Sequence, residues 1–450
     1  MADRRRLDIV RWIESLIKSN SDNRLLSHIR SKITWNRVFR VVSYTKSSLW
    51  IVPIIAILLQ QIAVRVLHVL DTLIVWPFEG VGLKGAETML QTIITLTLSF
   101  MVFTFGSLLV AIQVASGQMT PRIIATTLLR DNVIRYSVGL FVFTMVFSVA
   151  TLGRSEITAH QLPLFVAALF GFVSLAAFLY LIDYASRLLR PVSIAARVGE
   201  MGLNVIKSVY PQPTKEPLAM AESSRNLGMS ERTVSHHGKG EFILALNLEA
   251  VITAAKDANA IIEFVPRVGD FIGTEEPLFL VYGDAAEIDD RKLLAAVAFG
   301  TERTMEQDPT FSFRILADIA LKALSPAIND PTTAVLAIDQ LHRLLRLVGQ
   351  RHLSDDEILD DMGRLRLICR TPNWEDFVHL AFTEIRHCGA GNVQIARRLR
   401  AMIENLIHTL PEHRHAALRI ELGLLNSMVE RYYTLPEDLA LARGSDTQGL

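Results

Sequence analysis

The sequence is poor in cysteine and in charge. Its two cysteines, Cys369 and Cys388, form no CxxC pair, which leaves neither a disulfide scaffold nor a zinc knuckle. Charged residues make up only 20% of the chain, and Lys+Arg equals Asp+Glu at 46 each, so no excess of one sign indicates nucleic acid as a partner. Half of the residues are hydrophobic, which excludes intrinsic disorder. Together these features predict an integral membrane protein.

Catalytic and metal-binding motifs are also missing. The sequence contains no P-loop, GxGxxG, HExxH, GxSxG or protein-kinase pattern. His236 and His237 are adjacent, but they lack further ligands at the spacing of a metal site. We therefore expect no enzyme activity, no metal and no cofactor. A membrane-bound hydrolase is the third hypothesis, because a Ser/His/Asp triad occurs in any chain order.

Four stretches are long and apolar enough to cross a hydrocarbon layer of about 30 Å as helices. They are residues 49–69, 89–115, 133–152 and 162–182. The first 47 residues hold 11 Lys/Arg against four acids, and the loop after the second span adds Arg122 and Arg130. The other two loops hold one basic residue each, Lys84 and Arg154. Because basic loops stay in the cytoplasm, we expect a multi-pass protein of a bacterial inner membrane with both termini cytoplasmic.

The second span carries more polar side chains than a plain membrane anchor needs. Polar and small residues at helical spacing fall on or beside one stripe of it: Thr92, Thr95, Ser99, Gly106 and Gln113. An uncharged stripe of this kind suits the lining of a water-filled pore. It equally suits close packing against another helix. Four helices seldom enclose an aqueous path in one chain, so conduction would require a homo-oligomer around a symmetry axis.

Two arginines are candidate membrane-face charges. Arg65 lies in the outer part of the first span, where it either extends toward the lipid headgroups or forms an anion site facing the interior. Arg122 follows Thr120-Pro121, which is typical of a helix N-cap with proline at the first helical position. At the cytoplasmic face, Arg122 would suit a lipid phosphate or a docking carboxylate.

Beyond the four-span domain (residues 48–185), a connecting helix and a Pro/Ser-rich linker are expected over 186–232, and then a small β-barrel-like module over 233–285. Hydrophobic residues alternate after Gly240, and β-branched and aromatic runs follow over 260–273 and 277–283. The string VPRVGDFI followed by PLFLV looks like the barrel-sandwich modules of biotinyl and lipoyl carriers. Since no lysine stands in an exposed hairpin, we expect an adaptor module without a carrier role.

From about Asp289 the pattern turns helical, which predicts a helical domain over 286–443 and a disordered tail over 444–450. Apolar residues at helical spacing predict two helices within 311–348. Between them, Asp330 is the expected N-cap with Pro331 at the first helical position. The alternative is that Ser325, Asn329 and Asp330 present oxygens to a cation, ligand or partner. Asp318 is expected to pair with Lys322, four residues on.

Three strings carry a resemblance to a known family: TLSFMVFTFGSLLVAIQVASGQMTPRII, PRVGDFI and RTMEQDPTFSFRILADIALKALSPAINDPTTAV. They resemble a bacterial family of predicted membrane proteins classified as a domain of unknown function, family 2254. The resemblance implies four spans and a cytoplasmic domain, and it implies no activity.

The expected fold is a membrane α-helical protein with four transmembrane helices and a cytoplasmic α+β region. The leading hypothesis for its function is a homo-oligomeric channel or passive permeation protein for an ion or small solute, embedded in the lipid bilayer and regulated by the cytoplasmic domain. The alternative is a membrane-anchored scaffold or signalling protein without a pore.

Overall fold

The structure, a computed structural model, describes residues 34–73, 82–118, 120, 122, 131–154, 161–188, 190–214, 227–283, 288–353 and 356–446. The first 33 residues of the basic N-terminal segment and most of the Pro/Ser-rich linker (215–226) therefore lie outside the described residues. Contacts divide the chain into two units, each considered by itself. One comprises Met1–Tyr44, Ser224–Arg303 and Asp355–Arg370, and the other comprises Thr45–Ser223, Thr304–Ser354 and Thr371–Leu450.

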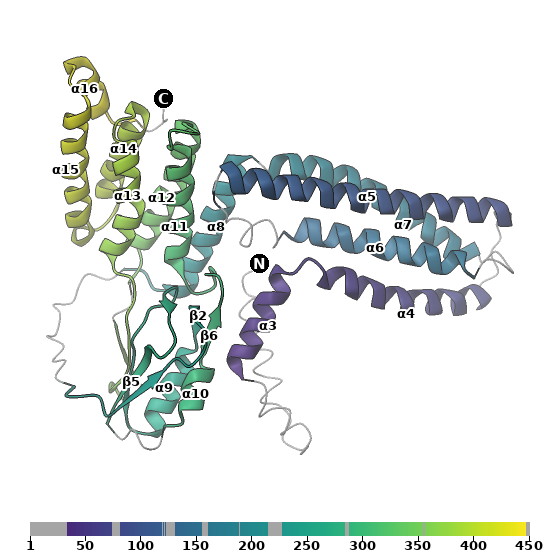
Figure 1. The fold of residues 1–450 in the computed structure, drawn as a ribbon, viewed down its shortest axis with the longest axis horizontal. Coiled ribbons are helices and arrows are strands. Elements are labelled where there is room, and N and C mark those ends of the chain that lie inside the picture. Colours follow the sequence, from purple (N-terminus) through teal and green to yellow (C-terminus); the bar gives the residue numbers. More distant parts are fainter. Residues whose placement is uncertain are drawn as a thin grey trace. The chain divides into compact units, whose positions relative to one another are not determined.

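Four helices of the second unit are long and apolar enough to cross a membrane, as predicted. They are α4 (Ile51–Leu73), α5 (Leu83–Gln118), α6 (Asn132–Leu152) and α7 (Gln161–Leu188), labelled in Figure 1. We call them the bundle. Helix α6 packs against each of the other three and is the most buried. Helix α5 begins six residues before its predicted start, because the polar residues after Leu83 continue the helix.

Aromatic and small side chains fill the interior of the bundle. Phe100 stacks on Phe178 with ring centroids 4.2 Å apart, and Phe141 meets Phe178 edge-on. The buried hydroxyls of Thr144 and Ser174 lie 3.0 Å apart and join α6 to α7 by a hydrogen bond. Hydrogen bonds of this kind hold helices together where no water competes. The interior of a single bundle is thus occupied by packed side chains.

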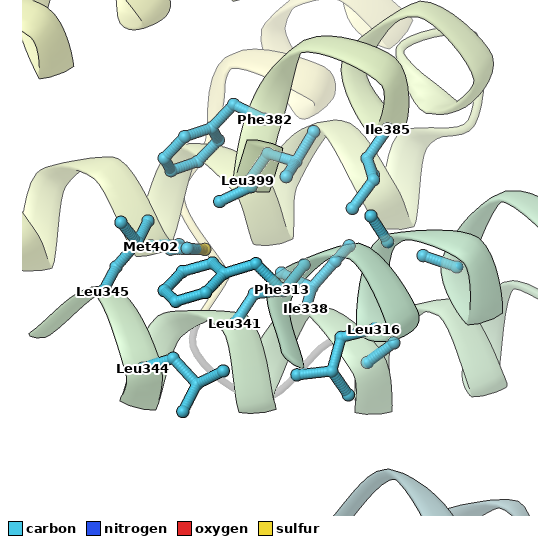
Figure 2. Close-up of a cluster of buried hydrophobic side chains, with 14 of the residues drawn as sticks. Phe313, Leu316, Ile338, Leu341, Leu344, Leu345, Phe382, Ile385, Leu399 and Met402 are labelled. Carbon is cyan, nitrogen blue, oxygen red and sulfur yellow. The ribbon is translucent and has the colours of Figure 1, made fainter. Parts of the chain in front are cut away.

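The second unit also contains a helical domain with a large hydrophobic core. Its helices are α8 (Pro191–Val209), α11 (Pro309–Ala323), α12 (Pro331–Gly349), α13 (Trp374–Gly389), α14 (Val393–Thr409), η3 (Glu412–Arg414), α15 (His415–Tyr432) and α16 (Pro436–Arg443). Figure 2 shows Phe313 of α11, Leu341 of α12, Phe382 of α13 and Met402 of α14 within one cluster of buried side chains. The predicted helix pair within 311–348 is confirmed.

Helix α8 belongs to this core, although it directly follows the last helix of the bundle. Its residues Ile194, Val198 and Ile206 are buried in the same cluster as α11 and α12. A Cβ placed on Gly202 would lie 2.6 Å from Ser312 Oγ, so only glycine allows this approach of α8 to α11. Helix α8 is therefore fixed to the helical domain by close packing.

The first unit is built on two sheets. The helices and strands are α3 (Trp35–Ser47, which ends in the second unit), β1 (Arg232–Ser235), β2 (Glu241–Leu246), α9 (Leu248–Asp257), β3 (Ile261–Phe264), β4 (Phe271–Ile272), β5 (Pro277–Tyr282), α10 (Asp290–Ala295), β6 (Val297–Gly300), β7 (Glu357–Leu359) and β8 (Leu365–Cys369). One sheet has the order β1-β5-β3-β8-β7, and the other has the order β4-β2-β6. Trp35 and Phe39 of α3 pack against the cluster of Leu244, Ala245 and Ala298 in the smaller sheet.

Two expectations for this region are corrected. The described strands form two open sheets and no closed barrel, because helix α9 interrupts the chain directly after β2. The expectation that the chain is helical throughout the region after Asp289 is also wrong. Strand β6 pairs with β2, and β8 pairs in parallel with β3, so residues far along the chain complete both sheets.

The ends of the helical domain also differ from expectation. Residues 447–450 lie outside the described residues, but Asp446, in the segment expected to be disordered, is buried. Its carboxylate lies 3.6 Å from the guanidinium of Arg397. The chain is therefore ordered at least to Asp446.

The two cysteines provide a simple check of this fold. Cys369 is buried in β8, and burial raises the pKa of its thiol to about 12, whereas Cys388 is exposed on α13. Because the thiolate is the reactive form, a maleimide at pH 8 is expected to label native protein once per chain, on Cys388. Mass spectrometry of labelled peptides measures this. Rapid labelling of Cys369 in folded protein would contradict the placement of β8.

Candidate functional site

The predicted polar stripe lies on the outer surface of the bundle. Thr92, Thr95, Ser99, Gly106 and Gln113 are all exposed in the single chain, and a Cβ placed on Gly106 would meet nothing within 4 Å. Successive residues of a helix turn by about 100°. By this rule the stripe lies on the opposite side of α5 from its buried residues, which include Leu90, Ile93, Thr97, Phe100, Thr104 and Leu108. The structure thus keeps the five residues on one broad face and turns that face away from α4, α6 and α7.

The hydroxyl groups of the stripe are satisfied by their own helix. Thr92, Thr95 and Ser99 donate to the backbone oxygens of Thr88, Gln91 and Thr95, at 2.8 to 2.9 Å. Such bonds to the carbonyl one turn earlier let hydroxyls sit in an apolar environment at little cost. The stripe therefore tolerates contact with a second helix as well as contact with water.

The exposed face of α5 also carries large apolar side chains beside the stripe, among them Val102, Phe103 and Leu109, whereas the described exposed faces of α4 and α7 have no comparable row of Thr and Ser. Large apolar side chains cover them: Ile54, Ile55, Leu58, Leu59, Ile62, Val66 and Val69 on α4, and Phe165, Leu169, Phe172, Val173, Leu179 and Ile182 on α7. These surfaces suit lipid tails. Arg65 is also exposed on α4, which is the position from which a long side chain reaches the headgroups, and not a position in the packed interior.

A buried carboxylate marks the end of the bundle where α5 finishes and α6 begins, which we call the α5–α6 end. Asp131 caps α6: its Oδ1 accepts hydrogen bonds from the backbone N–H of Val133 and Ile134, at 2.9 and 3.2 Å. Its Oδ2 accepts from the Tyr184 hydroxyl and from Arg197 Nη1, each at 2.5 Å. The Asp131 side chain is 2% exposed, so this carboxylate is almost fully withdrawn from solvent.

Arg197 carries this network from the bundle to α8. Its second Nη donates to the Tyr184 hydroxyl at 2.8 Å. Burial alone would lower the pKa of Arg197, but the hydrogen bonds with Asp131 and Tyr184 outweigh it and raise the pKa above its ordinary value. Arg197 is therefore charged near neutral pH. Sequence reasoning missed this network. The available signal was a lone acid directly before an apolar span, in a loop that is otherwise basic.

Arg122 forms a second connection at the α5–α6 end. Its backbone N–H donates to the Thr120 hydroxyl at 3.4 Å, as expected for a cap, although residues 121 and 123–130 lie outside the described residues. Its guanidinium pairs with the carboxylate of Asp318 on α11. A docking carboxylate is therefore the partner that the structure gives Arg122. The predicted Asp318–Lys322 pair is wrong, since Asp318 pairs instead with Arg122 and Arg314.

Arg314 extends this cluster into the helical domain. Its Nε donates to Asp318 Oδ1 at 2.8 Å and its Nη2 donates to Glu384 Oε2 on α13, also at 2.8 Å. The hydrogen bond from Arg314 lowers the pKa of Glu384 below its ordinary value of 4.5. A carboxylate whose pKa is lowered in the folded protein stabilises the fold at pH values above its ordinary pKa. This stabilisation is lost as the pH falls through the lowered pKa.

Side chains of the loop between α11 and α12 cap the two flanking helices. Asp330 accepts from the backbone N–H of Thr333 at 3.1 Å and from the Thr333 hydroxyl, so it is the N-cap that the sequence predicted. Ser325 donates its hydroxyl to the Lys322 carbonyl at 2.7 Å. Asn329 is exposed with a φ of 49°, a left-handed conformation that asparagine tolerates. Among the described residues no group of three His, Cys, Asp or Glu side chains could hold a metal ion. A ligand at this loop stays a prediction.

Comparisons with known proteins identify a family but no activity. A family model described as "Predicted membrane protein (DUF2254)" matches residues 46–405. Uncharacterised proteins of Mycobacterium bovis (strain ATCC BAA-935 / AF2122/97) and Mycobacterium tuberculosis (strain ATCC 25618 / H37Rv) are each 23% identical over 434 residues, covering 91% of this chain and 81% of theirs. No solved structure matches.

Proposed function

The chain belongs to this family of predicted membrane proteins, and from that premise we propose that it is a homo-oligomeric inner-membrane protein whose copies form a passive permeation path along α5. In this proposal both termini are cytoplasmic, and the cytoplasmic helices regulate the path. The observation that carries it is the direction of the polar stripe. The exposed face of α5 carries Thr92, Thr95, Ser99 and Gln113 among apolar side chains such as Val102 and Leu109, whereas the described exposed faces of α4 and α7 carry no such row of Thr and Ser.

The stripe supports an assembly because it is a poor surface for lipid. Gln113 has an amide that lipid tails leave without hydrogen bonds, and Gly106 offers the tails no side chain to pack against. Around a symmetry axis, the same stripe from each copy would face its equivalents. The packed aromatic interior of one bundle also favours a path between copies over a path within one.

The lining chemistry indicates what would pass. Thr92, Thr95 and Ser99 bring uncharged oxygens and no ionisable group, which suits a small polar solute or an ion without strong charge selection. The exposed Arg65 is on α4 and would not line this path. Active, proton-coupled transport has no support from these residues.

A scaffold without a pore is the second candidate, and the hydrogen bonds within α5 favour it. Since Thr92, Thr95 and Ser99 are already bonded to their own helix, the stripe does not need water. In this alternative α5 packs dry against α5 of another copy, and the helical domain recruits a partner.

Water accessibility of α5 distinguishes the two candidates. In a Cys388→Ser background, single cysteines at positions 92, 99, 106 and 113 are expected to react with a membrane-impermeant thiol reagent in liposomes. Matched cysteines at the buried Thr97 and at the lipid-facing Leu179 should stay protected. Protection of all six positions in an intact oligomer would favour the dry scaffold and contradict the path.

Flux measurements test conduction directly. Liposomes containing the purified protein are expected to release ions or small osmolytes faster than empty ones. Ser99→Leu and Gln113→Leu should reduce this release because they narrow and dry the lining, whereas Leu179→Ala should not. An oligomeric protein that releases none of the tested solutes would contradict the proposal.

A further inference from the structure

The chain between α5 and α6 is tied to the helical domain at two points. Arg122 lies four residues beyond the last residue of α5 and pairs with Asp318 on α11. Asp131 lies directly before α6 and pairs with Arg197 on α8. Both α8 and α11 contribute to the same hydrophobic core. The two ion pairs therefore connect the neighbouring ends of α5 and α6 to helices that share one hydrophobic core.

The two connections differ in how easily they separate. Asp131 is 2% exposed, accepts four hydrogen bonds and caps a helix, so its separation from Arg197 would leave a buried charge without a partner. Arg122 is 49% exposed, and its pair with Asp318 is accessible to salt. Exposed pairs contribute little and exchange readily with water and other ions. The Arg122–Asp318 pair is thus the weaker of the two connections.

Charge balance shows what Arg122 contributes. Asp318 and Glu384 bring two negative charges, and Arg314 and Arg122 bring two positive charges. Without Arg122, the cluster on α11 and α13 would carry one excess negative charge. The Asp318 side chain in this cluster is only 17% exposed. Arg122 therefore balances the charge of this cluster.

We infer that the Arg122–Asp318 pair is a reversible electrostatic latch by which the helical domain holds the inner end of α5, while Asp131–Arg197 is the fixed point about which that end moves. The latch weakens as ionic strength rises, because its charges are partly solvated. The latch acts on α5, the helix that carries the polar stripe. The inference rests on the proposed function only where it concerns the effect of the latch on permeation.

A double-mutant cycle on full-length protein in nanodiscs tests the latch. Arg122→Gln and Asp318→Asn remove one charge each without introducing repulsion, and Lys322→Gln is the matched control one turn along α11. The measured quantity is amide hydrogen exchange in the last two turns of α5 (residues 112–118). Each single variant is expected to speed exchange there about threefold to fivefold, as for loss of an exposed ion pair.

Coupling and salt dependence decide the outcome. Arg122→Gln should add nothing in the Asp318→Asn background, because the pair is already lost. About 1 M salt should reproduce the effect in the unmodified protein and leave the variants unchanged. Additive effects, a response to Lys322→Gln of the same size, or an absence of salt dependence would overturn the latch.

Permeation is measured separately on the same variants. Altered flux together with faster exchange supports both proposals. Faster exchange in a protein that conducts nothing supports the latch and contradicts the permeation path, so the two proposals fail independently.

Discussion

Replacing Asp131 with alanine is expected to lower the free energy of unfolding by about 3 kcal/mol. The variant loses the cap of α6 and leaves the charge of Arg197 without its carboxylate. Removing one partner of a buried pair costs about 3–5 kcal/mol, and the lower end applies because the Arg197 side chain is 30% exposed. Thermal unfolding in detergent, followed by hydrogen exchange in the first turns of α6, measures the loss.

The matched control for Asp131 is Asp183. It also pairs with an arginine, Arg187, at 2.9 Å, but the two side chains are 54% and 68% exposed. Asp183→Ala is therefore expected to change stability by less than about 1 kcal/mol. Asp131→Asn should fall between the two alanine variants, because asparagine retains the cap and loses the charge. Equal effects of Asp131→Ala and Asp183→Ala would contradict the role given to burial.

Local patterns in the sequence were sufficient for the bundle and for the helix pair at the centre of the helical domain. Hydropathy identified all four spans because each lipid-exposed helix carries its apolar signal within one window. Asp330-Pro331 identified the start of α12 because a cap and a first-turn proline act on adjacent residues. The same reasoning could not extend α5 back to Leu83, since the polar first turns do not raise hydropathy.

Long-range pairing could not be predicted in this way. Strand β8 is five residues long and finds its partner β3 about a hundred residues earlier, so its own sequence does not reveal the sheet. Asp318 illustrates the same limit for charges. Arg314 and Lys322 each lie four residues from Asp318 in the sequence; Asp318 pairs with Arg314, and tertiary contacts bring its other partner, Arg122, from 196 residues away. The stripe on α5 was visible in the sequence, whereas its outward direction required the packing of α5 against α6 and α7.

The second large effect is expected in the helical domain, at a buried pair between α13 and α15. Glu421 is 1% exposed, and its Oε2 accepts from Arg386 Nε at 3.0 Å, while Arg386 is 6% exposed and its Nη1 also contacts Met428 Sδ. Glu421→Ala leaves a guanidinium inside the domain without a counter-charge. The expected loss is about 3–5 kcal/mol, which corresponds to a fall in Tm of roughly 10 °C for a domain of this size.

The double variant Glu421→Leu/Arg386→Met separates the cost of an unpaired charge from the value of the pair itself. Two apolar side chains of similar volume should restore most of the stability, since replacing a whole buried pair is often neutral. Glu430→Ala is the exposed control, because its pair with Arg443 has side chains 53% and 46% exposed. Thermal unfolding of all three variants, with hydrogen exchange in α13 and α15, measures these effects. If the double variant were as unstable as Glu421→Ala, the loss would come from packing around Glu421, and the unpaired-charge explanation would be wrong.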